Sequence, residues 1–185
     1  MIEVSDYDPA WAARFVALRE EYAAALSDAG VPVVAIEHVG STAVPGLAAK
    51  PIIDCDIVVR AEHVEAASAV LVSLGFEARG ELGIPQRWAF WEPARLVGTN
   101  TYVIVEGSLA LHNHLAVRDV LRSDPSLRDE YGEVKKRVGA TAADIYEYGG
   151  GKNDMVQRIL AAAGMSEAER DSINSNEVPV TPRKR

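Results

Sequence analysis

The sequence predicts a single α+β domain, in which helices flank a mixed β-sheet of about five strands. Three observations support this fold class. Of the 185 residues, 48% are hydrophobic and 25% are charged, the balance of a soluble globular protein that buries its own core. Helical and extended patterns alternate along the chain without an internal repeat. The patterning stops after Gly164, so we assign residues 1–164 to the domain and residues 165–185 to a polar C-terminal tail.

An amphipathic helix comes first. The Asp8-Pro9 pair predicts its beginning and Gly30 predicts its end. Between them, apolar residues recur at spacings of three and four and therefore share one face: Trp11, Phe15, Leu18, Tyr22 and Leu26. The β-rich run 33–40 predicts a strand that leads into a turn-prone segment, GSTAVPG. The run PIIDCDIVV, residues 51–59, is too short and too β-branched for a helix and predicts a buried central strand.

The middle of the chain predicts one more helix and the remaining strands. Residues 61–74 have a helical pattern that stops at Gly75. Extended stretches follow around residues 76–80, 86–93 and 100–107, separated by Gly and Pro. We expect them to form neighbouring antiparallel strands.

The remaining pattern is helical. One helix covers residues 110–123, and another restarts at Asp124-Pro125 and runs to residue 138. A final helix follows three glycines, residues 149–151, and ends near Gly164. The glycines favour a flexible hinge, and Lys152 then either belongs to that hinge or faces a cleft. We interpret the basic run of Lys135, Lys136 and Arg137 as a solvated helix face.

Composition limits the classes of partner. Nineteen Lys and Arg residues against 27 Asp and Glu residues give a formal net charge of −8. The protein as a whole therefore repels polyanions, which argues against long DNA or RNA and requires a local basic patch for any polyanionic partner. The single cysteine, Cys55, excludes an internal disulfide and a multi-cysteine zinc site. Because the N-terminus lacks an apolar leader and no apolar run is long enough for a membrane span, we expect a cytoplasmic protein without a membrane partner.

Two carboxylates in an apolar strand are the candidate metal-binding residues. Asp54 and Asp56 are two residues apart, so their side chains leave the same face of the strand about 6.5–7 Å apart. Burial and mutual repulsion destabilise such a pair unless a cation compensates, and Mg²⁺ prefers oxygen ligands of this kind. Upstream, Gly40 allows backbone N–H groups to approach a phosphate, and Ser41 adds a hydroxyl donor. The alternative is a strand end whose acids simply reach solvent.

These residues also resemble a known superfamily. Gly40-Ser41 followed by Asp54-x-Asp56 is similar to the signature of polymerase-β-type nucleotidyltransferases. More narrowly, residues 38–59 and 113–122 resemble the GrpB family of small bacterial proteins, often described as uncharacterised or nucleotidyltransferase-like. The resemblance extends from about Pro9 to about Gly164.

The resemblance implies a nucleotidyltransferase-like fold and a set of roles. Asp54 and Asp56 would hold Mg²⁺ (or Mn²⁺), and Gly40 and Ser41 would hold the phosphates of a nucleoside triphosphate that reacts with a small-molecule acceptor. Superfamily enzymes commonly add a third catalytic carboxylate from a later strand. The extended stretch TYVIV contains no acid, so Glu106 just beyond it is the nearest candidate.

Several other residues have two interpretations. Glu92 is a second candidate for the third carboxylate. Lys50 either reaches a phosphate or solvates a loop. We expect Arg118 to bind the nucleotide, because its forked guanidinium can clamp a phosphate or carboxylate; the alternative is that it pairs with an acid and fastens its helix to the sheet. For His114 we expect a structural role.

We therefore expect a Mg²⁺-dependent nucleotidyltransferase. The alternative is a non-catalytic module on the same fold that binds a nucleotide or a CoA-like ligand. The sequence does not specify the oligomeric state.

Overall fold

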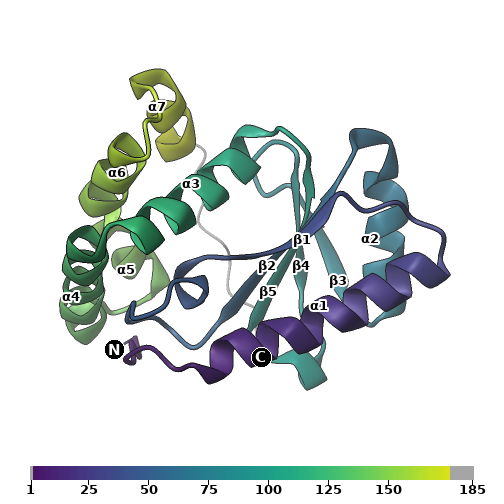
Figure 1. Ribbon diagram of the computed structural model, residues 1–185, viewed down its shortest axis with the longest axis horizontal. Helices are drawn as coiled ribbons and strands as arrows, with labels where there is room; N and C mark the ends of the chain where they lie inside the picture. Colours follow the sequence, from purple (N-terminus) through teal and green to yellow (C-terminus); the bar gives the residue numbers. More distant parts are fainter. Residues whose placement is uncertain (1, 176–185) are drawn as a thin grey trace.

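The computed structural model describes residues 2–175, and its centre is a five-stranded mixed sheet with the order β1-β2-β5-β4-β3 (Figure 1). Strands β2 and β5 are parallel, and the other neighbours are antiparallel. The strands are β1 (Ala35–Val39), β2 (Ile53–Val59), β3 (Glu77–Gly80), β4 (Arg87–Trp91) and β5 (Thr99–Val105). The α+β fold class and the five strands are thus confirmed.

Helices cover both faces of the sheet. Helices α1 and α2 lie on one face, whereas α3 crosses the other with α4, α5 and α6 beside it (Figure 1). The helices are α1 (Ala10–Asp28), α2 (Val64–Ser73), α3 (Leu109–Ser123), α4 (Pro125–Thr141), α5 (Ile145–Gly151), α6 (Asn153–Ala162) and α7 (Glu167–Ser175). The two faces have different compositions, and this difference positions the site.

Side chains along β2 point alternately to the two faces of the sheet, one of which is an apolar core and the other polar. Ile53, Cys55 and Ile57 are fully buried in the cluster beneath α1 and α2. Asp54 and Asp56 alternate with these residues and therefore face α3. The predicted face of α1 is buried in the same cluster, and Gly30 ends that helix with a φ of 68°. The sequence prediction that the two acids share one face is consistent with this register.

The glycine run does not form the expected hinge. Residues 149–151 are the last turn of α5, and α6 begins after Lys152. A Cβ atom on Gly151 would lie 2.6 Å from the side chain of Val138 on α4. This glycine therefore permits close packing of α5 on α4, and the hinge interpretation is wrong.

Part of the expected tail is a helix. Residues 167–175 form α7, which packs against α3 and α6, and Met165 just before it is buried. Residues 176–185 of the expected tail lie outside the described residues. The domain boundary at residue 164 stays a prediction.

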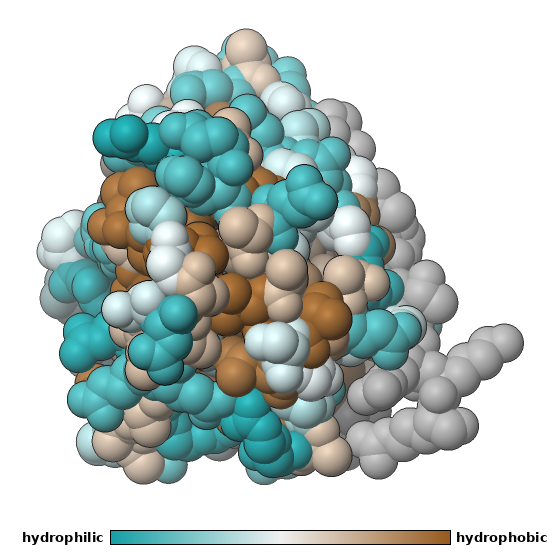
Figure 2. Space-filling view, turned by 90° about the vertical axis from the view of Figure 1, so that its right-hand side faces the viewer, coloured by the Kyte–Doolittle hydropathy of each residue, from teal (hydrophilic) through white to brown (hydrophobic). Residues whose placement is uncertain are grey.

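The surface on the α2 side is mixed in polarity. Figure 2 shows apolar residues gathered near the middle of that face, with hydrophilic residues around them. Val72 on α2 is 49% exposed. Among the helices that the structure describes, none is long and apolar enough to cross a membrane.

Candidate functional site

The turn after β1 brings Gly40 against Asp54. Gly40 has a φ of 70°, and Ser41 then opens a short 3-10 helix. A Cβ atom on Gly40 would collide with the Asp54 carboxylate. The sequence predicts that this glycine allows the backbone to approach a phosphate. The structure adds a second reason for glycine here, which is that only this residue leaves room for Asp54 while adopting a left-handed backbone.

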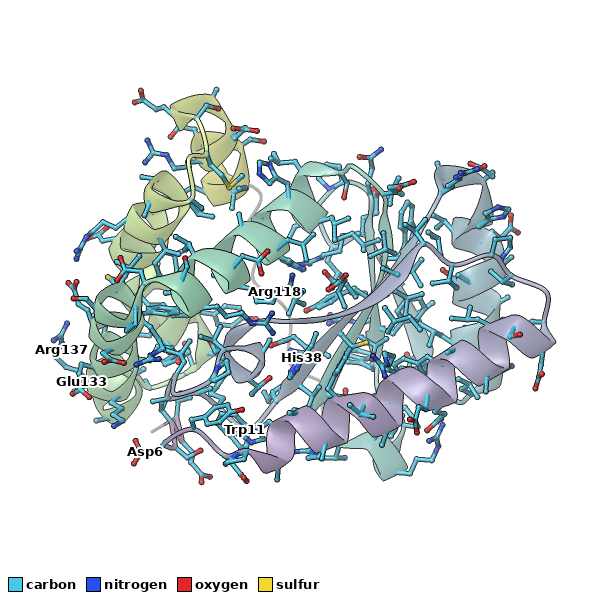
Figure 3. All side chains as sticks on the ribbon, in the orientation of Figure 1. Asp6, Trp11, His38, Arg118, Glu133 and Arg137 are labelled. Atoms are coloured by element: carbon cyan, nitrogen blue, oxygen red, sulfur yellow. The ribbon has the colours of Figure 1, made fainter. Side chains whose placement is uncertain are left out.

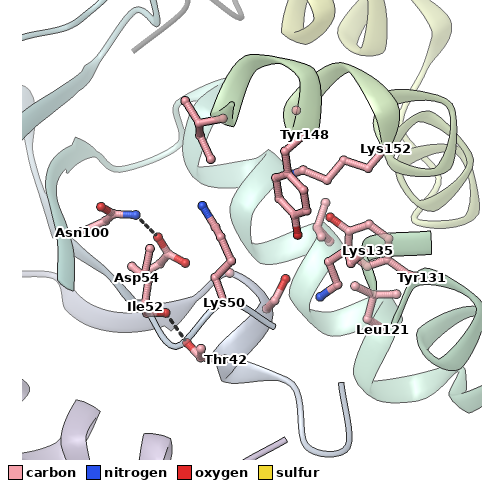
Figure 4. A pocket seen from close by; sticks show the side chains of 15 residues that line it. Thr42, Lys50, Ile52, Asp54, Asn100, Leu121, Tyr131, Lys135, Tyr148 and Lys152 are labelled. Atoms are coloured by element: carbon pink, nitrogen blue, oxygen red, sulfur yellow. Dashed lines mark hydrogen bonds between the residues drawn. The ribbon is translucent and has the colours of Figure 1, made fainter. Parts of the chain in front are cut away.

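A cavity of about 340 Å³ opens beside this turn, between the sheet and helices α3, α4 and α5 (Figure 4). Four of the predicted site residues line it: Gly40, Ser41, Lys50 and Asp54. Further polar residues come from β5, α4, α5 and the α5–α6 junction: Asn100, Tyr131, Lys135, Tyr148 and Lys152. The structure therefore joins the predicted turn and acid to a second group of residues that lie far away in the sequence.

Three lysines surround this cavity. The Nζ atoms of Lys50 and Lys152 each lie 5.4 Å from the ring centroid of Tyr148. The Nζ atom of Lys135 lies 4.5 Å from the ring centroid of Tyr131. Lys135 is only 2% exposed, and its Nζ has no hydrogen-bond partner among the described residues. In a protein with a net charge of −8, this is the local basic patch that a polyanionic ligand requires.

Burial changes the protonation of these amines. Loss of solvent, together with the charge of Lys152, lowers the pKa of Lys135 to about 6, although Asp54 opposes the shift. Burial and Lys152 also lower the pKa of Lys50. An ammonium group in such surroundings is costly unless an anion pairs with it. The cavity thus favours an anionic ligand.

The interpretation of Lys135 as part of a solvated helix face is wrong. Tyr131 and Val138 lie four residues before it and three residues after it, so all three share one face of α4. Lys136, the next residue, is turned outwards and pairs with Asp6 at 2.7 Å. The apolar spacing around Lys135 was the signal in the sequence that placed it on the inner face.

Asp54 lies on the sheet side of the cavity and pairs with an amide. The Nδ2 atom of Asn100 donates a 2.8 Å hydrogen bond to Asp54 Oδ1, and the two residues are opposite each other in the register of β2 and β5. Burial raises the pKa of Asp54, although the hydrogen bond from Asn100 partly lowers it again. The strand next to the acid pair therefore presents an amide where the superfamily resemblance implied a carboxylate.

Asp56 has different surroundings, since it is fully buried and does not line the cavity. Its Oδ2 atom accepts a 2.7 Å hydrogen bond from Nδ1 of His114 on α3. Burial opposes charging of His114, but the charge and hydrogen bond of Asp56 outweigh it and raise the pKa of His114. The Oδ1 atom of Asp56 is buried with no hydrogen-bond partner in the described part of the chain.

The donor set fits a divalent cation that shares its ligands with a substrate. The unpartnered Oδ1 of Asp56 and the Asp54 carboxylate on the same face supply hard oxygen donors, as Mg²⁺ prefers. Within residues 2–175, no group of three or more His, Cys, Asp or Glu side chains is close enough to hold a metal ion alone. Phosphate oxygens and water commonly complete the coordination of Mg²⁺ in proteins.

Two predicted residues lie away from the cavity. Arg118 extends from α3 towards the sheet (Figure 3), where it pairs with Glu37 of β1 at 2.6 Å and donates to the His38 carbonyl. This geometry supports the alternative that Arg118 fastens α3 to the sheet. Glu106 is exposed beyond the far end of β5, because the parallel register places Val105 beside Val59. Its position argues against a role beside Asp54.

Glu92, the other candidate for the third carboxylate, does not line the cavity either. Neither candidate acid therefore contributes to the lining around Asp54.

Comparison with known proteins identifies the family. The model of the GrpB protein family matches residues 1–162. The chain belongs to the GrpB family. It is 31% identical to the UPF0157 protein YqkA of Bacillus subtilis over 177 residues, which cover 95% of this chain and 51% of YqkA. This GrpB-family chain thus spans about half the length of that relative.

Solved structures agree with the family assignment. The crystal structure of the conserved protein GrpB from Enterococcus faecalis is 28% identical, with a TM-score of 0.73, and the match covers 94% of this chain and 98% of that one. The structure of the GLD-2/RNP-8 complex matches with a TM-score of 0.54 at 14% identity, over 96% of this chain and 70% of that one. At that identity the likeness concerns the fold alone. This GrpB-family chain therefore shares its α+β fold with both structures.

Proposed function

We propose that this GrpB-family protein transfers a nucleotidyl group from a nucleoside triphosphate to a small acceptor, with Mg²⁺ (or Mn²⁺) bound at Asp54 and Asp56. The observation that carries the proposal is the grouping of Lys50, Lys135 and Lys152 around a cavity whose sheet side carries Asp54. A cavity of about 340 Å³ falls within the size range of small-molecule sites.

The lysines match the charge of a triphosphate. The Nζ atom of Lys135 would gain the hydrogen-bond partner that the described residues do not give it. Ser41 offers a hydroxyl donor at the same cavity. The rings of Tyr131 and Tyr148 lie beside the amino groups of the three lysines and keep those groups in place before a ligand arrives. Phosphate binding would therefore draw on donors that are already positioned.

The chain's residues bind and orient the reactants. A divalent ion at the acid pair supplies neutralisation of charge on the phosphates. The lysines hold the triphosphate, and the hydrogen bond from His114 fixes one oxygen of Asp56. The acceptor oxygen forms a bond to the α-phosphorus while the bond to the bridging oxygen breaks, pyrophosphate leaves, and the acceptor proton passes to solvent.

A lysine substitution tests the nucleotide site. Titration calorimetry with ATP, CTP, GTP and UTP, each with Mg²⁺, would compare Lys135→Met with its neighbour Lys136→Met. Loss of a charged hydrogen bond predicts nucleotide binding about 10- to 150-fold weaker in Lys135→Met. The Lys136→Met variant is the matched control, because Lys136 is on the same helix and faces outwards. Equal affinities of the two variants would contradict the nucleotide assignment.

A specific observation favours a second candidate, a module that binds nucleotides without turnover. Asn100 stands beside Asp54, where the superfamily resemblance implied a carboxylate. An assay of pyrophosphate release, with bound nucleotide and a panel of hydroxyl-bearing acceptors, separates the two functions. Release that requires Mg²⁺ and an acceptor supports the transferase, whereas binding without release supports the module.

A further inference from the structure

A second cavity, of about 260 Å³, lies at the other end of α3. It is enclosed by the first half of α3, the loop before β4 and helix α7, and its lining includes Ile84, Arg87, Leu109, His114 and Ile173. His114 lines this cavity and bonds to Asp56, whose neighbour on the same strand face, Asp54, lines the first cavity. The two cavities therefore adjoin opposite ends of one polar row of side chains.

Arg87 brings a positive charge to this second cavity. The residue is 8% exposed, and its guanidinium lies 4.6 Å from the ring centroid of Tyr102. Its Nε atom is buried without a hydrogen-bond partner among residues 2–175. His114 differs from Arg87, because its Nδ1 atom already pairs with Asp56. A buried guanidinium with an unused donor is costly in the free protein and favours an anionic ligand.

The beginning of α3 adds a second, independent donor set. Leu109 and Ala110 are the first residues of this 15-residue helix, and both line the cavity. Backbone N–H groups in the first turn lack partners inside a helix, and the helix dipole favours negative charge there. The Ser108 side chain accepts from the Leu111 N–H and so satisfies only one of these groups.

The rest of the lining is mixed in polarity and the space is small, with polar side chains from Gln86, Asn113 and Ser172. Ile84, Pro85, Leu109 and Ile173 contribute hydrocarbon surface. The volume of about 260 Å³ is below the usual range for drug-sized ligands. One guanidinium and one helix terminus match one anionic group, and the apolar part of the lining matches a short hydrocarbon body.

We propose that this cavity binds a small molecule that carries a single anionic group, such as a carboxylate, on an apolar body. Binding at this cavity does not depend on the nucleotide site.

The test uses hexanoate and its neutral analogue hexanamide with the full chain and without nucleotide. For a ligand this small, the expected dissociation constant for hexanoate is on the order of 1 mM, measured by ligand-detected NMR or calorimetry. Hexanamide should bind at least about 10-fold more weakly, because it lacks the charge that Arg87 and the helix terminus recognise.

Variants locate the binding. Arg87→Met should weaken hexanoate binding about 10-fold or more. Arg79→Met is the matched control, since Arg79 also lies over an aromatic ring, that of Trp91 at 4.3 Å, but does not line the cavity. If Arg87→Met does not fold, Ile173→Glu on the peripheral helix α7 places a negative charge at the cavity and should also weaken hexanoate binding.

Each outcome decides the proposal. Selective binding of hexanoate that Arg87→Met or Ile173→Glu reduces, and Arg79→Met does not, supports it. Equal binding of the acid and the amide, full binding by the cavity variants, or no hexanoate binding at about 10 mM overturns it. The nucleotide proposal is judged separately by Lys135→Met with nucleoside triphosphates, so a failure of one can be told from a failure of the other.

Discussion

A lysine that is 2% exposed, and whose Nζ atom has no hydrogen-bond partner in the described part of the chain, is held in place by packing and by a tyrosine ring. Lys135 therefore reduces the stability of the free protein while it prepares a site for an anion. The lowered pKa of Lys135, about 6, has the same cause, because burial disfavours the charged form of the amine. A function for this residue explains why an energetically unfavourable group lies beside Asp54.

The first residue-scale prediction is a pH dependence of stability. The unfolded chain keeps the proton of Lys135 up to a pKa near 10.4, whereas the folded chain releases it above about pH 6. Between these pH values the unfolded state binds more protons, so the free energy of unfolding rises with pH by up to about 1.4 kcal/mol per unit. Urea unfolding at pH 7 and pH 9 should show this gain in the wild type relative to Lys135→Met. Parallel pH profiles of the two proteins would contradict it.

A second residue-scale prediction separates Gly40 from Ser41. Gly40→Ala should lower the free energy of unfolding by at least about 1 kcal/mol, because the left-handed backbone is strained and the new Cβ meets Asp54. Ser41→Ala should leave stability within about 0.5 kcal/mol but weaken nucleotide binding by about 1.5–3 kcal/mol. Urea unfolding and calorimetry measure the two effects. Unchanged nucleotide affinity in Ser41→Ala would remove Ser41 from the phosphate site.

At the scale of elements, the parallel pairing of β2 with β5 places Asn100 opposite Asp54 and carries Glu106 beyond the other end of the sheet. A carboxylate at position 100 would therefore stand beside the acid pair. Asn100→Asp should tighten Mn²⁺ binding, by calorimetry, and lower stability without metal because two carboxylates then face each other. The control is Asn113→Asp on α3, which lines the second cavity instead. Equal metal affinity of the two variants would show that β5 does not contribute to a cation site.

Local patterns predicted the elements of the first half well. The periodic apolar face of α1 and the β-branched run of β2 both specify their structures without help from the rest of the chain. The same is true of Gly40, Ser41, Lys50 and Asp54, because one short segment and the strand that follows it place all four at the cavity. The sequence was sufficient where the determinants are local.

The features that the sequence did not predict depend on contacts between elements that lie far apart in the chain. Lys135 and Lys152 reach the cavity because α4 and the α5–α6 junction fold back against α3. The glycines of α5 form a helix because Gly151 packs closely on Val138, a contact with another element that the glycine run alone does not indicate. Likewise, the strand register, and not spacing along the chain, separates Glu106 from Asp54.

At the scale of the whole molecule, the two faces of the sheet have different roles. The face beneath α1 and α2 holds the largest apolar cluster, including all five predicted residues of α1. The face beneath α3 holds the buried polar groups Asp56 and Arg87, and both cavities lie on it. The larger apolar core thus lies in one layer, and both proposed binding sites lie in the other. Substitutions in the second layer can be tested for binding with little expected loss of the first core.

The position of Cys55 has a practical consequence. Its thiol is 0% exposed, it lies between His38 of β1 and Thr101 of β5 in the register, and burial raises its pKa. A thiol reagent therefore reaches it only when β2 separates from its neighbours. Because the chain contains one cysteine, no other thiol contributes to the signal. The rate of Cys55 modification thus measures how often the centre of this sheet opens, and its slowing by a bound ligand would report affinity without any engineered probe.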